Sequence, residues 1–414
     1  MHKIMFVLLC LLSGCAAQHN NIKLANQLQQ EPPEKILSIL SEKEPDQSDF
    51  AQYYLNLGYL QLLSGEFELS IDSLLKAKNE MLSLQATSIS ENVAAGTVNE
   101  TFRRYSGYPT DRVMVHNMLA LSYLFNNGID DARVEMLQAD VEMKKLAQSD
   151  SLNGQLASTH LLSAIIYELL DERSNAFISY QLAEKILKER NISLPRGLKL
   201  GLLRMSDKMG NDTQYQYYSK QYPVLSKLKQ VRQKKHQVFG LYFDGVVSNK
   251  VQQSLAVPSF NGKQIVRVSM PAYTSVQHRD QHNQINDNEQ KINSEVVENV
   301  DKLVREDLDK EYPSILLLTT TRAIAKYQLV KEAQDKDPIL GILANLATIF
   351  SEVADLRSWN MLPATIQFSY LETDADHIVV STNHQGDSVV ELAALKQHVI
   401  LSTGLSDKVF HYEQ

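Results

Sequence analysis

The stretch YYLNLGYLQLLSGEFELSIDSLLKAK, residues 53–78, decides the fold of the first half of the chain. Its apolar residues recur at steps of three and four, which is the period of an amphipathic helix. Gly58 and Ser70 are small residues at positions where two such helices touch, and Tyr54 fills the space beside them. The stretch therefore predicts a closely packed pair of antiparallel helices.

The same spacing returns twice further along the chain. One set is Ala120, Tyr123, Ala132, Met136 and Ala139, and the other is Ala164, Tyr167, Ala176, Tyr180 and Ala183, both with steps of 3, 9, 4 and 3 residues. Small residues at helix contacts with an aromatic neighbour are typical of tetratricopeptide repeats. The repeat centres are 62 and 44 residues apart, so we expect an irregular array over residues 31–225. The alternative is a set of unrelated helical hairpins, which also place alanines at this spacing.

Tetratricopeptide-like arrays expose a concave groove that holds peptides or partner proteins. Arginine pairs well with carboxylates, so the polar cluster on this array is a candidate site for an acidic or carboxyl-terminal peptide of a periplasmic or outer-membrane protein. Its members are Arg103, Arg104, Tyr105, Asp130, Asp131, Arg133 and Glu135. The alternative is that these residues pair with one another and support the fold.

A dense basic run, residues 226–236, marks the expected boundary between this array and a second domain over 237–414. The period then changes to two-residue alternation, which predicts strands at 237–243 and 264–270. We expect a loop at 277–292, helices at 293–310 and 314–334, a buried apolar helix at 339–354 and closing strands at 364–371, 377–381 and 399–402. The whole chain is therefore expected to be a multidomain α+β protein whose second domain has an antiparallel or mixed sheet.

The first 15 residues resemble a bacterial lipoprotein signal. Lys3 precedes an apolar run, and Leu12-Ser13-Gly14-Cys15 resembles the lipobox, so residues 1–14 would be cleaved and Cys15 would carry the acyl chains. Residues 15–30 would be the tether, and Ala16 in place of Asp favours the outer membrane, facing the periplasm. The alternatives are an ordinary secretory signal with a chance cysteine, or a buried helix of a cytoplasmic protein.

Charge and cysteine content exclude several classes of protein. The chain has 41 Lys and Arg against 49 Asp and Glu, a formal net charge of -8, which argues against nucleic-acid binding because that requires a basic surface. Cys10 and Cys15 are its two cysteines, so a mature lipidated chain has no thiol and no disulfide.

No known catalytic or cofactor motif occurs, so we expect no enzyme activity, no catalytic residue, no cofactor and no metal. His278, Asp280 and His282 could approach a metal ion, but they lie in a polar stretch where solvated histidines are more common. Trp359 is a candidate partner contact, and packing over the second core is the alternative. An envelope-polymer-binding or modifying site in the second domain would use Arg322, Lys326, Asp355 and Arg357.

Three stretches together resemble a family of tetratricopeptide-containing bacterial envelope lipoproteins. They are Tyr105-Ser106-Gly107 with 128–135, Asn249-Lys250 with 270–273, and 355–359 with Leu362-Pro363. The resemblance implies a role in envelope or peptidoglycan maintenance and supplies no active-site residue. We therefore expect a non-enzymatic outer-membrane scaffold or adaptor; the alternatives are the polymer-binding protein above and a structural subunit of an envelope machine.

Overall fold

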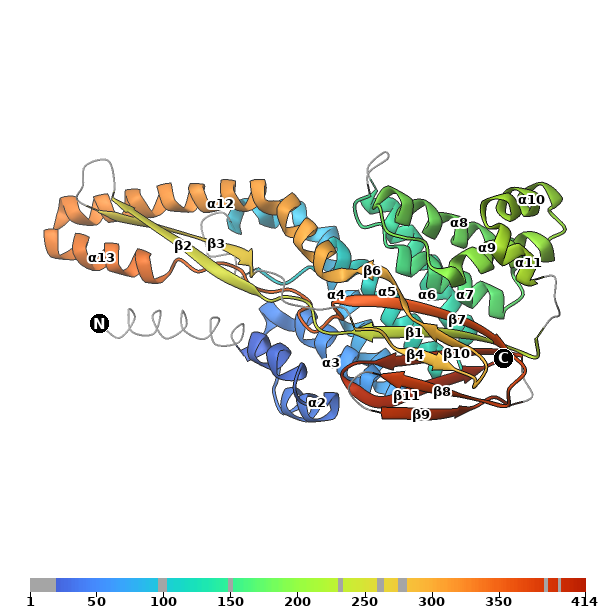
Figure 1. Ribbon diagram of the computed structural model, residues 1–414. Helices are drawn as coiled ribbons and strands as arrows, with labels where there is room; N and C mark the ends of the chain where they lie inside the picture. The colour runs from blue at the N-terminus through green and yellow to red at the C-terminus, as the bar shows by residue number, and fades with distance from the viewer. Residues whose placement is uncertain are drawn as a thin grey trace.

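The computed structural model describes residues 20–95, 103–147, 152–229, 234–258, 264–274, 281–382, 386–393 and 396–414. Figure 1 shows a helical array, a sheet packed against it and a long arm that extends away from both. The expected signal peptide, Cys15, His278 and Asp280 lie outside the described residues. Among the described residues, no helix combines the length and the apolar character that a bilayer crossing requires.

The array consists of consecutive antiparallel helices. The bounds are α2 (Pro33–Ser41), the short 3-10 helix η1 (Gln47–Asp49), α3 (Phe50–Ser64), α4 (Phe67–Ala95), α5 (Pro109–Phe125), α6 (Ile129–Leu146), α7 (Ala157–Leu169), α8 (Arg173–Glu189), α9 (Arg196–Lys208), α10 (Asp212–Gln221) and α11 (Pro223–Lys229). Helices α3 and α4, α5 and α6, and α7 and α8 pack as pairs, as the repeated spacing predicts.

Close approach within the pairs depends on the predicted small residues. A Cβ atom on Gly58 of α3 would lie 2.6 Å from Cγ of Leu74 on α4, and the Ser70 hydroxyl donates to the Gly58 carbonyl at 2.7 Å. Ala120, Ala132, Ala164 and Ala176 are all 0% exposed. The tetratricopeptide-like arrangement is therefore confirmed by the packing itself.

The second half contains a mixed five-stranded sheet in the order β11-β10-β1-β7-β6, in which β1 is parallel to β10 and the other neighbours are antiparallel. A four-stranded antiparallel sheet, β5-β4-β8-β9, packs against one face of the five-stranded sheet through a small apolar cluster, and β2 and β3 form a separate hairpin. The strands are β1 (His236–Asp244), β2 (Lys250–Pro258), β3 (Ile265–Tyr273), β4 (Gln284–Asn286), β5 (Lys291–Asn293), β6 (Glu295–Asn299), β7 (Thr365–Thr373), β8 (His377–Thr382), β9 (Gly386–Glu391), β10 (Gln397–Thr403) and β11 (Ser406–Glu413). The α+β class with a mixed sheet is confirmed.

The arm consists of α12 (Val300–Lys336), α13 (Pro338–Phe350) and the β2–β3 hairpin. Two helices were expected where the structure has the single helix α12, which continues through Pro313. The prediction of a buried apolar helix is wrong for α13: Ile339, Ile342 and Leu343 are 68%, 63% and 58% exposed. Its apolar composition reflects a face that the rest of the described chain leaves uncovered.

The expected loop at 277–292 is also corrected, because β4 and the start of β5 lie in it. In the basic run, α11 continues to Lys229, and Lys234 and Lys235 pair with Asp374 and Asp376 at 3.0 and 2.6 Å. These two lysines hold the start of β1 against the turn after β7.

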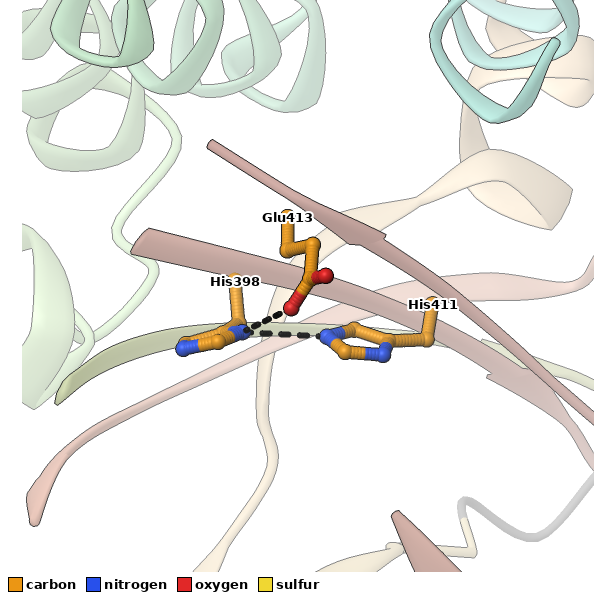
Figure 2. A group of neighbouring side chains, drawn as sticks. All are labelled: His398, His411 and Glu413. Carbon is orange, nitrogen blue, oxygen red and sulfur yellow. Dashed lines mark hydrogen bonds and ion pairs between the residues drawn. The ribbon is translucent and has the colours of Figure 1, made fainter. Parts of the chain in front are cut away.

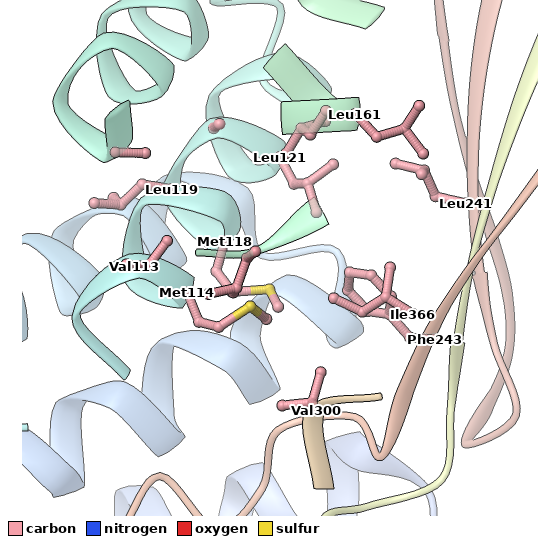
Figure 3. Packing of buried hydrophobic residues seen from close by; sticks show 14 of the residues in the cluster. Val113, Met114, Met118, Leu119, Leu121, Leu161, Leu241, Phe243, Val300 and Ile366 are labelled. Carbon is pink, nitrogen blue, oxygen red and sulfur yellow. The ribbon is translucent and has the colours of Figure 1, made fainter. Parts of the chain in front are cut away.

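The five-stranded sheet covers the inner face of the helical array. All 13 residues of α7 are buried, and one apolar core joins the inner helices to β1, β7 and β10. Figure 3 shows Met118, Leu121 and Leu161 of the array across from Phe243 and Ile366 of the sheet. The prediction of an open groove is therefore wrong for this face, because side chains of strands in the second half of the chain occupy it.

Candidate functional site

A cleft of about 480 Å³ lies between the loop before α5, the middle of α12 and the segment 355–357. It brings together residues that the sequence analysis assigned to two different hypotheses: Arg103, Arg104 and Tyr105 of the array, and Asp355 and Arg357 of the second half. The remaining lining residues are Ser106, Gly107, Tyr108, Pro271, Glu311, Ser314, Ile315, Leu317 and Leu318. Both halves of the chain therefore contribute to one concave surface.

Two of the three arginines that line this cleft are exposed. Arg103 and Arg104 are exposed, and Arg104 pairs with Glu80 of α4. Among the described residues, no carboxylate pairs with Arg103. Leu317 of α12, 69% exposed, also lines the cleft and adds an apolar side chain to it. The cleft thus combines cationic donors with an apolar wall.

Lys250 of β2 lies buried behind the cleft, 1% exposed. Its ammonium group donates to the Arg357 carbonyl at 3.0 Å and lies over the ring of Tyr108. Burial lowers the pKa of Lys250 to about 8, although the carboxylates of Asp355, Asp111, Glu311 and Asp307 favour its charged form. Sequence reasoning missed this lysine, whose only signal was its place in a stretch that resembles the envelope family.

Asp111 is a buried acid in the first turn of α5, directly after the loop that lines the cleft. It accepts hydrogen bonds from the Tyr105 hydroxyl and from the Tyr108 amide, the latter at 3.1 Å. Burial raises the pKa of Asp111 to about 6, and the Tyr105 hydrogen bond partly opposes that rise. These hydrogen bonds fix Tyr105 against the start of α5 and thereby orient the loop that carries Arg103 and Arg104.

Arg357 connects the cleft to the rest of the fold. It is 2% exposed and pairs with Asp355 through Nε and Nη2 at 2.9 and 2.7 Å. Its Nη1 donates to the carbonyls of Ser48 and Arg103 at 2.7 and 2.6 Å. Burial opposes ionisation of Asp355, but the Arg357 guanidinium outweighs it and lowers the pKa of that carboxyl. Arg357, from the second half of the chain, therefore holds the backbone of the loop that carries Arg103 and Arg104.

The other predicted residues of the array lie elsewhere. Arg133 pairs with Glu172 of the next repeat at 2.5 Å. Glu135 is 4% exposed and bonds Lys78 and His116, both at 2.7 Å. Asp131 is exposed on the first turn of α6. Arg133 and Glu135 thus connect helices of the array to one another, which agrees with the alternative that these residues support the fold.

Trp359 is also corrected as a partner contact, because it is 0% exposed. Its ring meets that of Tyr59 on α3 edge to face, with centroids 6.4 Å apart. The tryptophan lies where the helical array and the second half pack together.

The residues of the polymer-site hypothesis do not form one cluster. Arg322 and Lys326 on α12 pair with Glu352 at 3.6 and 2.5 Å, whereas Asp355 and Arg357 pair with each other at the cleft. Each positive charge has a carboxylate of the chain within reach, so this set offers no open cationic surface for a polymer.

A second group of polar residues lies at the far end of the five-stranded sheet. Nδ1 of His398 is 3.0 Å from Nε2 of His411 and 3.8 Å from Oε2 of Glu413, and these three ligand atoms lie within 4.8 Å of one another (Figure 2). Burial lowers the pKa of the His411 imidazole, although Glu413 opposes this. No metal site is expected from the sequence, and these three residues are not among the sequence-predicted candidates. By contrast, His282 is engaged by Gln367 at 2.8 Å.

No family model matches the chain. No curated protein matches it either. Among solved structures, the apo form of RapI is 18% identical with a TM-score of 0.34, and the match covers 48% of this chain and 63% of RapI. Nearly identical TPR-like repeats of a Podosopora anserina kinesin light chain are 14% identical, covering 54% and 95% with a TM-score of 0.32. MamA AMB-1 is 11% identical, covering 53% and 94% with a TM-score of 0.34. Similarity at this level says nothing about what this chain binds.

Proposed function

We propose that this protein is a non-enzymatic adaptor of the bacterial cell envelope that binds an acidic or carboxyl-terminal peptide segment of a protein partner in the cleft at Arg103. The observation that carries the proposal is the exposed Arg103 guanidinium, which no described carboxylate neutralises, above a cleft built by both halves of the chain. Arginine binds carboxylates through two parallel hydrogen bonds, so a peptide carboxylate is the ligand that this wall favours.

The shape of the cleft supports a peptide ligand. Its volume of about 480 Å³ is in the range of about 300–1,000 Å³ that small-ligand pockets usually have, which is enough for the side chains of a short segment. Ile315, Leu317 and Leu318 supply apolar contact next to the arginines. A segment with a carboxylate followed or preceded by an apolar side chain matches both features.

The site of action in this proposal is the periplasmic face of the outer membrane. It rests on the lipobox-like sequence Leu12 to Cys15 and on Ala16 after it. Acyl chains on Cys15 would hold the cleft near one membrane face and raise the local concentration of partner and adaptor. The envelope-family resemblance of residues 105–107, 249–250 and 355–359 favours a partner in envelope or peptidoglycan maintenance.

Site-specific photocrosslinking in cells tests the binding proposal. A photoreactive residue at Ser106, in the cleft, should give a discrete adduct, whereas one at Tyr217 on α10, 50% exposed, should not. Arg103→Glu should reduce the Ser106 adduct about tenfold, since a hydrogen-bonded charge pair contributes about 1.5–3 kcal/mol, and Lys220→Glu serves as the control. Equal adducts in both variants would contradict the proposal.

The anchor has a separate test. Cys15→Ser should abolish incorporation of labelled palmitate and release the protein from the membrane fraction. Retention of label in this variant would show that the acyl chains are attached at another residue.

A further inference from the structure

The end of the five-stranded sheet brings two histidines and a glutamate together by strand register. His398 of β10 is directly opposite Glu413 of β11, and Ile400 is opposite His411. Side chains two residues apart on a strand share a face, so His411 and Glu413 both flank His398 on one side of the sheet. That side faces the four-stranded sheet, since Ile400 and Val238 pack in the apolar cluster between the two sheets.

From this arrangement we propose that His398, His411 and Glu413 bind a divalent transition-metal ion, of which Zn²⁺ is the best match. Zinc takes histidine nitrogens and carboxylate oxygens at about 2.0–2.2 Å in tetrahedral geometry, which sets neighbouring ligand atoms about 3.3 Å apart. The distances of 3.0 Å between the two imidazole nitrogens and 3.8 Å between His398 and Glu413 lie on either side of that value. Small side-chain movements therefore suffice to form the site.

The carboxylate of Glu413 supports a cation here. Its Oε2 atom is buried and has no hydrogen-bond partner among the described residues, although the side chain as a whole is 35% exposed. A buried charged oxygen without a partner is costly, and such a group needs an explanation. An ion next to His398 Nδ1 satisfies it, and the exposed part of Glu413 gives the ion a path from solvent.

His236 of β1 occupies the position of an outer-shell residue. Its Nδ1 lies 2.9 Å from Nε2 of His398, the ring nitrogen that faces away from the proposed ion. Ligand histidines usually use their second nitrogen in a hydrogen bond that fixes the ring and its tautomer. The ring of His398, 0% exposed, is thus held by β1 in the orientation that points Nδ1 toward His411 and Glu413 (Figure 2).

Three protein ligands leave one tetrahedral position for water or for a ligand from another molecule. The proposed ion joins β11, the edge strand of the sheet, to its neighbour β10. It therefore stabilises the carboxyl-terminal strand, and this inference is independent of the peptide cleft.

Zinc titration of the full chain tests the site. The protein is extracted in detergent with a tag that contains no histidine, stripped with a chelator and titrated with Zn²⁺ by calorimetry, and its metal content is then measured. We expect one Zn²⁺ per chain and a higher melting temperature on binding. His411→Gln and Glu413→Gln should each weaken binding by roughly tenfold or more, a loss that even outer-shell changes can cause.

His377→Gln is the matched control, because His377 is an exposed histidine of β8 outside the group, and it should bind as the unaltered chain does. The metal-free melting temperatures of all variants show whether a loss of binding reflects misfolding. Two results would overturn the proposal: no stoichiometric Zn²⁺ on the unaltered chain, or unchanged affinity in folded His411→Gln and Glu413→Gln. The first would leave a hydrogen-bonded pair of histidines beside Glu413, without a metal ion.

Discussion

The ammonium nitrogen of Lys250 lies 3.7 Å from the centre of the Tyr108 ring. Lys250 belongs to the hairpin of the arm and Tyr108 to the loop that carries Arg103 and Arg104, so this cation–π contact joins the arm to the helical array. The buried charge costs desolvation energy, which nearby carboxylates and the Arg357 carbonyl only partly offset. Contact between the two halves is therefore coupled to the protonation of one lysine.

Because of Lys250, the stability of the folded chain should change with pH in the alkaline range. Its pKa is about 8 in the folded chain against 10.5 as the ordinary value, so between these pH values the unfolded chain binds more protons and stability rises with pH. From pH 8 to 10, the unfolding free energy of the wild type should rise by about 2 kcal/mol relative to Lys250→Met. Urea denaturation at both pH values measures this, and parallel pH profiles of the two proteins would contradict it.

Glu298 gives stability the opposite pH dependence: the unfolding free energy should fall as pH rises through the neutral range. This carboxylate of β6 accepts hydrogen bonds from the amide and hydroxyl of Ser158 at the start of α7. Burial raises its pKa from 4.5 to about 7, although Arg190 favours the charged form. Its contribution to stability is therefore full below pH 4.5 and is lost as pH rises through 7.

Glu298→Gln removes this titration while keeping an acceptor oxygen. Relative to the wild type, it should gain about 2 kcal/mol of unfolding free energy between pH 5 and pH 8. Glu289→Gln, at a side chain that is 78% exposed, should change little at either pH. Equal effects of both substitutions at pH 8 would show that Glu298 is not buried against α7.

Gly197 on α9 allows the array to approach the sheet. A Cβ atom there would lie 2.4 Å from Cε1 of Phe368 and 2.7 Å from Cβ of Tyr370 on β7. Gly197→Ala should lower stability by about 1–3 kcal/mol through overpacking, despite the better helix propensity of alanine. Lys185→Ala on α8, 66% exposed, is the control in thermal melts, and a more stable Gly197→Ala protein would contradict the close packing of α9 on β7.

The repeat array could be predicted because its signal is local: Gly58, Ala120 and Ala164 recur with partners only a few residues away. The covering of the array's inner face could not be predicted, because Phe243 and Ile366 belong to strands far along the chain. Arg103, Arg104 and Tyr105 are consecutive in the sequence and line one cleft, but Arg357 joins them only through tertiary contacts. The residue pair His411 and Glu413 shows the two-residue period of one strand face, yet only the register with His398 makes it a candidate metal site.

The exposed face of α13 predicts an unusual tolerance of substitution. Leu343 is 58% exposed, whereas Leu121 in the shared core is 1% exposed. Leu343→Ala should change the unfolding free energy by no more than about 0.5 kcal/mol, and Leu121→Ala should cost about 2–5 kcal/mol. A large loss of unfolding free energy in Leu343→Ala would mean that the apolar face of α13 is covered.

Arg357 should be the residue of the cleft whose loss affects the fold most. Arg357→Met removes the partner of the half-buried Asp355 carboxylate and the donor to the Arg103 carbonyl. Breaking a fully buried pair on one side costs about 3–5 kcal/mol, and we expect a loss near the lower end of this range because Asp355 keeps some contact with water. Arg357→Lys should restore only part of this, because an ammonium group cannot reproduce the two parallel bonds to Asp355. Chemical denaturation of both variants measures the loss, and amide hydrogen exchange at residues 103–108 should be faster in both. A stable Arg357→Met protein with unchanged exchange in that loop would mean that the loop is held by Tyr105 and Asp111 alone.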